Sequence, residues 1–298
     1  MTPGRRRVAG GGRPGYDRAM NTRRAFLGGL AALSTTGVAP RVLARGRPLD
    51  LADPRDRLTA IAKLRGATDD RLVISYVIGA RYAVPEHRLV PMMGILAATF
   101  SRWTRLDADR FEARSLEVAF FTDLATGGLL EQWKNPVTGA VVDVPVTRMG
   151  PSRIVITADG LTVDVPGGEA SGLRLVHVFQ PPVVVGDQVW LTEQINVDGP
   201  PGPRPFVYNE LSTYAARKSD LDDPGQAAVP TDVQYQSLIT YRPWMGFGDA
   251  PGHTLARGAG RRVSRIDELP PQYVALAKRL HPDVIADPLA ALAARPGA

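Results

Sequence analysis

The chain has 298 residues, no cysteine and a formal net charge of +6. The lack of cysteine excludes disulfides, thiol nucleophiles, zinc–thiolate sites and cysteine-bound iron–sulfur clusters. The first 44 residues hold eight arginines against one acid, Asp17, so the remaining chain carries 28 basic and 29 acidic residues. That remainder lacks the positive excess that binds phosphates, and we expect no nucleic-acid partner.

The most specific motif lies near the N-terminus, where residues 22–33 read Thr-Arg-Arg-Ala-Phe-Leu-Gly-Gly-Leu-Ala-Ala-Leu. Two arginines before a short apolar run are typical of a bacterial twin-arginine export signal. The run is shorter than the roughly 20 apolar residues that cross a bilayer, and cleavage is expected after Ala44. The alternative is a basic N-terminal segment before a buried helix.

We therefore interpret residues 1–44 as a twin-arginine signal peptide, with Met20 as an alternative start. The interpretation implies the twin-arginine translocase as a partner during export. It also implies a periplasmic or secreted mature chain without a transmembrane span.

The first element after the signal is a predicted helix over residues 54–65. Asp53 is suited to cap it and Pro54 to open its first turn, and apolar residues follow at helical spacing. From there to about residue 244 the apolar residues recur with period two, which predicts strands. The predicted strands cover residues 72–83, 92–106, 111–121, 129–133, 140–147, 153–157, 161–165, 173–180, 188–197, 205–215 and 233–241.

Short turns separate most of these strands, so neighbours are predicted to be antiparallel. We expect a mainly β fold, an antiparallel meander closed or nearly closed into a calycin-like barrel over residues 45–285. Residues 219–230 are expected to form a lid or a surface loop, and residues 246–260 a Gly-rich loop. A second helix is predicted from Asp267 to Leu280, and residues 286–298 are expected to be a frayed tail.

The chain carries a set of distinctive turn motifs in residues 121–127, 133–139, 242–246, 251–252 and 267–270. With them, residues 55–285 resemble the bacterial family called domain of unknown function eighteen-thirty-eight. The resemblance implies a fold rather than a chemistry, and it supplies no catalytic residues.

The strongest candidate for chemistry is a pair of polar residues on apolar strand faces. In residues 173–180, His177 shares a face with Leu175 and Phe179, and in residues 188–197 Glu193 shares a face with aliphatic residues. A hairpin symmetric about Val185 places His177 directly opposite Glu193. A carboxylate that holds an imidazole is the usual arrangement of a general base, so both are candidate catalytic residues. The alternatives are a passive buried pair, or an error in register that reverses the faces.

A second group of residues is a candidate for ligand binding. In residues 208–214, polar side chains occupy every second position. They either line a wet cavity or form the solvent face of the barrel, and the pattern slightly favours the solvent face. Tyr235 lies on the strand over residues 233–241, Arg242 and Trp244 follow it where a rim to the cavity could form, and His253 lies in the Gly-rich loop. The candidate ligand-binding residues are Tyr208, Glu210, Tyr214, Tyr235, Arg242, Trp244 and His253.

The four histidines, at positions 87, 177, 253 and 281, show no paired metal spacing, and no phosphate-loop, dinucleotide or Gly-x-Ser-x-Gly motif is present. We expect no metal and no cofactor. The leading hypothesis is an exported protein with an apolar barrel cavity for a small apolar or aromatic ligand, acting as a cofactor-independent lyase, isomerase or hydrolase. The alternatives are a non-catalytic periplasmic carrier and a structural envelope protein.

Overall fold

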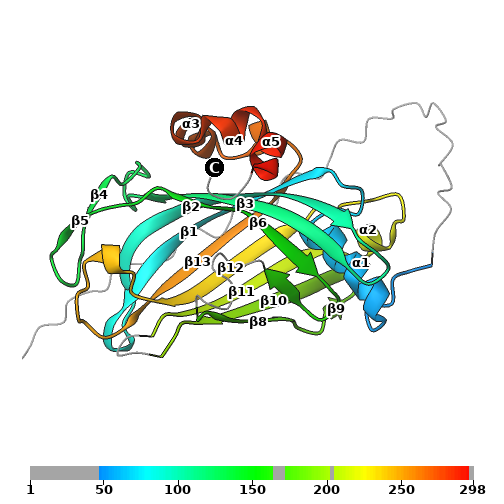
Figure 1. Cartoon of the computed structure of the whole chain (residues 1–298), viewed down its shortest axis with the longest axis horizontal. Coiled ribbons are helices and arrows are strands. Elements are labelled where there is room, and N and C mark those ends of the chain that lie inside the picture. Colours follow the sequence, from blue (N-terminus) through cyan, green and yellow to red (C-terminus); the bar gives the residue numbers. More distant parts are fainter. Residues whose placement is uncertain (1–46, 164–171, 202–204, 295–298) are drawn as a thin grey trace, which may run out of the picture. The chain divides into compact units, whose positions relative to one another are not determined.

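The computed structural model describes residues 47–163, 172–201 and 205–294 (Figure 1). The interpreted signal peptide lies outside the described residues. The long strands are β1 (Leu72–Val84), β2 (Val90–Arg105), β3 (Phe111–Thr122), β6 (Thr147–Ile156), β10 (Gln188–Asp198), β11 (Val207–Arg217), β12 (Asp232–Thr240) and β13 (His253–Val263). The short strands are β4 (Gln132–Lys134), β5 (Val141–Asp143), β7 (Leu161–Val163), β8 (Arg174–Phe179) and β9 (Val183–Val185).

The helices are few and short. The α-helices are α1 (Pro54–Arg65), α2 (Lys218–Asp222), α3 (Pro271–Leu280), α4 (Pro282–Ala286) and α5 (Pro288–Ala293), and the 3-10 helices are η1 (Pro85–His87), η3 (Pro243–Met245) and η4 (Ile266–Glu268). Within the described ranges, none of them is long and apolar enough to cross a bilayer.

The predicted fold class is confirmed. Eleven strands form one antiparallel sheet in the order β7-β6-β3-β2-β1-β13-β12-β11-β10-β8, with β9 also paired to β10. The sheet curls into a barrel in which β7 and β8 approach each other without a shared ladder, which leaves one unsealed seam. The segments predicted as strands at 129–133 and 140–147 form the separate β4–β5 hairpin instead of barrel strands.

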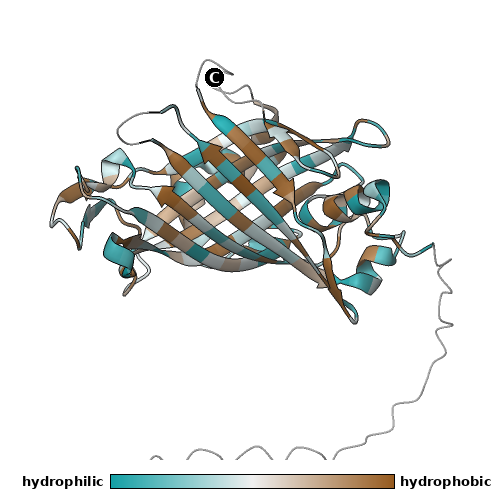
Figure 2. Ribbon diagram, turned by 90° about the horizontal axis from the view of Figure 1, so that it is seen from below, coloured by the Kyte–Doolittle hydropathy of each residue, from teal (hydrophilic) through white to brown (hydrophobic). Residues whose placement is uncertain are grey.

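Hydrophilic and hydrophobic residues alternate along the strands (Figure 2), and the two sets face opposite sides of the wall. On β3, Glu117 and its alternate neighbours face the interior, while Leu116, Val118 and Phe120 are buried on the outer side. Helices α3 to α5 cover that outer side through Tyr273 and neighbouring apolar residues (Figure 1). Residues 288–293, expected as a frayed tail, therefore form a packed helix, because Leu292 is buried against the barrel.

The expectation of a Gly-rich loop over residues 246–260 is wrong for its second half. Strand β13 begins at His253 and pairs with both β1 and β12. Its glycines are required by close backbone contact, because a Cβ atom at Gly260 would lie 1.7 Å from the carbonyl oxygen of Tyr76. The strand lacks the apolar alternation that predicts strands, since small residues and arginines occupy it.

One end of the barrel is closed by α1 and α2. Asp53 caps α1 by accepting hydrogen bonds from the backbone N–H groups of Arg55 and Asp56. Leu221 and Val229, from the segment expected as a lid or a surface loop, join the apolar cluster under α1. This segment is therefore a packed part of the barrel end.

Candidate functional site

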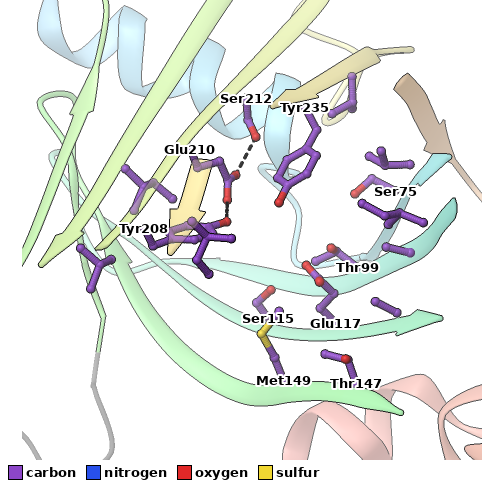
Figure 3. A pocket seen from close by; sticks show the side chains of 18 of the residues that line it. Ser75, Thr99, Ser115, Glu117, Thr147, Met149, Tyr208, Glu210, Ser212 and Tyr235 are labelled. Carbon is purple, nitrogen blue, oxygen red and sulfur yellow. Dashed lines mark hydrogen bonds between the residues drawn. The ribbon is translucent and has the colours of Figure 1, made fainter. Parts of the chain in front are cut away.

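The barrel encloses a cavity of about 750 Å³, a size typical of small-molecule sites. Apolar residues such as Ile95, Trp103 and Phe121 line it together with arginines. Carboxylates and hydroxyls also line it, among them Glu117, Glu210 and Ser212 (Figure 3). The lining is therefore mixed rather than uniformly apolar.

His177 and Glu193 form a buried hydrogen bond, with Nε2 of His177 2.8 Å from Oε1 of Glu193. The predicted register is wrong by two residues, because His177 lies opposite Ile195 and Glu193 lies opposite Phe179. A shift of two keeps both side chains on one face, so they meet diagonally. The turn falls at Gly186, which has φ +58°, and Asp187, because Val185 pairs with Gln188; a one-residue offset between β9 and β8 then leaves a net shift of two.

Neither residue of this pair is among those that line the cavity. Glu193 is 1% exposed, and it contacts two residues that do line the cavity. Nη1 of Arg65, at the end of α1, lies 3.1 Å from Oε1 of Glu193. The hydroxyl of Tyr214 donates to the other carboxylate oxygen over 3.1 Å. Glu193 thus holds an arginine and a tyrosine of the cavity wall in place.

The charge of Glu193 follows from these contacts. Burial raises the pKa of its carboxyl, but Arg65, His177 and Tyr214 lower it by more, so the net direction is down. Glu193 is therefore ionised at neutral pH, and Nε2–H of His177 donates to it. Nδ1 of His177 is buried and has no hydrogen-bond partner among the described residues.

The polar stripe on β11 faces the cavity, which corrects the slight preference for a solvent face. Glu210 accepts hydrogen bonds from the hydroxyls of Tyr208 and Ser212, the latter over 2.7 Å (Figure 3). Burial raises the pKa of Glu210, and the bond from Tyr208 opposes that rise. On β12, the hydroxyl of Tyr235 donates to Ser237 over 2.7 Å.

A second carboxyl group, Glu117, points into the cavity from β3, across the barrel from Glu210 (Figure 3). Burial and the negative charge of Glu210 raise the pKa of Glu117 to about 7, although a hydrogen bond with Thr99 acts against the rise. A carboxyl group of this kind carries or releases a proton near neutral pH. Two coupled carboxyls in one cavity are therefore able to donate and accept protons.

Another part of the cavity wall is basic and aromatic. Arg81 and Arg242 line it together with Trp244 and Phe121. Two of the candidate ligand-binding residues, Arg242 and Trp244, thus line the cavity. His253, the remaining candidate, is the first residue of β13 and is not among the lining residues.

Sequence reasoning missed Glu117, Arg65 and Arg81. The signal for Glu117 was present, since it alternates with Ser115 and Ala119 on one face of β3. The other face of β3 is more apolar because it packs under α3 to α5, so periodicity alone does not show which face lines the interior. Arg65 is brought to the cavity by the docking of α1, and no local pattern marks this contact.

Within the described part of the chain, no three His, Asp or Glu side chains cluster as a metal site would require. The described residues that line the cavity supply carboxyls, phenols, hydroxyls and guanidiniums.

The sequence profile of one family, DUF1838, described as "Protein of unknown function", matches residues 74–291. The chain belongs to this family. The match spans the barrel strands from β1 onward and helices α3 and α4. No curated protein matches the chain.

Proposed function

We propose that this protein is a cofactor-independent enzyme that transfers protons on a small molecule held in the barrel cavity. The observation that carries the proposal is the pair of carboxyls, Glu117 and Glu210, on opposite walls of one cavity. Repulsion between them supports a division of labour in which one holds a proton while the other is ionised.

Glu117 is the proton donor and acceptor in this proposal, because its pKa of about 7 suits exchange in both directions. Glu210 is fixed by Tyr208 and Ser212, and it sets the pKa of Glu117 by its charge. His177 and Glu193, the residues predicted to be catalytic, act as positioning residues, since Glu193 contacts Arg65 and Tyr214 at the cavity wall.

Proton transfer is tested without knowledge of the natural substrate by deuterium uptake in ²H₂O. Phenylacetone, 2-tetralone and phenylpyruvate carry exchangeable C–H groups and are small enough for the cavity. NMR would follow the loss of their C–H signals with wild-type protein, with Glu117→Gln and with the exposed control Glu131→Gln. We expect at least a tenfold faster exchange than in buffer for one probe, abolished by Glu117→Gln and kept by the control.

The competing function is that of a carrier. Binding of these probes without any acceleration of exchange overturns the enzyme in favour of the carrier. Acceleration that survives Glu117→Gln removes Glu117 from the mechanism.

We also propose that the chain is exported by the twin-arginine pathway before it acts. The support is the sequence of residues 22–33 alone. In a bacterial host, residues 1–44 fused to a folded reporter should deliver it outside the cytoplasm, and Arg23→Lys with Arg24→Lys should abolish delivery. Unchanged delivery by the double variant would contradict the proposal.

A further inference from the structure

Arg81 is a half-buried cation of the cavity wall with few partners of its own. Its Nη1 donates to the buried hydroxyl of Thr254 over 3.2 Å, and its guanidinium lies 5.5 Å from the centre of the Phe121 ring. Its Nε is buried without any hydrogen-bond partner among the described residues. No carboxylate within these residues forms an ion pair with Arg81, and a buried donor without a partner is costly to maintain.

A second arginine lies close to the first. Arg242 is the residue before η3, exposed at the edge of the cavity, and it is near enough to Arg81 for their charges to repel. Its guanidinium lies 4.8 Å from the centre of the Phe206 ring. Two like charges facing one space, without an acid between them, favour the entry of an anion.

The carboxyls of the cavity do not serve as counterions for this pair. The arginine that acts on Glu210 and Glu193 is Arg65, which enters from α1. Arg81 and Arg242 thus form a basic region of the cavity wall, in which the groups acting on Arg81 are Tyr235, Tyr208 and Arg242 and not a carboxylate. Aromatic residues, Phe121 and Trp244, lie beside the basic region.

We propose that Arg81 and Arg242 form a binding site for the carboxylate group of an aromatic or aliphatic organic acid. This inference rests on the proposed function and names its substrate class. The planar guanidinium of Arg81 matches a carboxylate geometrically, and its free Nε–H supplies a donor that the protein leaves unused. The apolar body of the acid lies against the aromatic residues. Its uncharged far end reaches Glu117 and Glu210, where a second negative charge is repelled.

The test compares three fluorescent ligands of nearly equal size: 1-naphthaleneacetate, 2-(1-naphthyl)ethanol and 2-(1-naphthyl)ethylamine. Each is titrated into the folded barrel protein and into the variants Arg81→Gln, Arg242→Gln and Arg257→Gln. Arg257 is the matched control, because it is exposed on β13 and absent from the cavity lining. Circular dichroism verifies that each variant is folded.

We expect the carboxylate to bind at least tenfold more tightly than the alcohol, and the amine more weakly than both. Arg81→Gln should reduce the preference for the carboxylate to less than threefold, Arg242→Gln should reduce it partly, and Arg257→Gln should keep it. If Arg81→Gln fails to fold, Arg242→Gln decides: a preference lower than that of the wild type supports the anion site, and an unchanged preference overturns it.

The alternative outcomes separate this inference from the proposed function. Equal binding of alcohol and carboxylate, or a preference that survives both Arg81→Gln and Arg242→Gln, overturns the anion site and leaves a ligand-binding cavity standing. Failure of all three ligands to bind overturns both the anion site and the ligand-binding cavity on which the proposed function depends.

Discussion

The substitution Glu117→Gln keeps the size of the side chain and its hydrogen bonding to Thr99, but it removes the ionisation. In the wild-type protein the pKa of Glu117 is raised from 4.5 to about 7 by burial and by the charge of Glu210. Between these two pH values the folded chain holds a proton that the unfolded chain has released. The free energy of unfolding of the wild type should therefore fall as the pH rises through this window.

The size of the effect follows from the pKa change. At about 1.4 kcal/mol for each pKa unit, a rise from 4.5 to about 7 corresponds to roughly 3 kcal/mol. Glu117 is half-buried, so solvent screening weakens the effect and we expect about 1–3 kcal/mol. Glu117→Gln should thus gain about that much stability over the wild type between pH 4.5 and pH 8.

Urea unfolding followed by tryptophan fluorescence, at half-unit intervals from pH 4.5 to 8.5, measures this difference. Glu131→Gln, an exposed carboxyl on the β4–β5 side of the chain, is the matched control and should show a constant difference. A constant difference between Glu117→Gln and the wild type would refute the reasoning, because it would show that Glu117 ionises normally.

Three further predictions follow from the contacts around the cavity. Thr99→Val should raise the pKa of Glu117, because it removes a hydrogen bond that lowers this pKa. Glu210→Gln should lower the pKa of Glu117, because it removes a repelling charge. Carboxyl NMR titration checks both variants, and shifts in the same direction would contradict the account. Glu193→Gln should lower the free energy of unfolding by about 3 kcal/mol, since the half-buried Arg65 then lacks the counter-charge of the fully buried carboxylate. Urea unfolding against Glu131→Gln checks it, and a loss no larger than that of the control counts against a structural role. Gly260→Ala should cost at least about 3 kcal/mol of stability or prevent folding, because its Cβ would meet the carbonyl oxygen of Tyr76. The control is Ala259→Ser, at the exposed neighbouring residue. Equal stability of the two variants would argue against the close approach of β1 and β13.

Much of the fold was predictable because its strands obey period two and its turns are short. The helix over residues 54–65 matches α1, since the cap and the apolar spacing are both local signals. β13 was missed because its glycines reflect contact with β1, which lies far away in sequence. No local pattern reports such a contact.

The candidate site was also partly predictable, because period two fixes which side chains share a face of a strand. His177 and Glu193 meet because both lie on one face of paired strands, and an error of two residues in register preserves the face. Their separation from the cavity was not predictable, because it depends on Arg65 and Tyr214, which come from other elements. Glu117 was missed because β3 is covered on both faces, so the presence of a polar residue did not show which face of the strand lines the cavity.

The central claim is that the barrel cavity holds a carboxyl group poised to exchange a proton near neutral pH. Its most direct test is a ¹³C NMR titration of protein labelled at the glutamate side-chain carboxyls, with the Glu117 signal assigned by its loss in Glu117→Gln. The account predicts a titration midpoint near pH 7 for this signal. A midpoint near 4.5, the value of an ordinary glutamate, would contradict it.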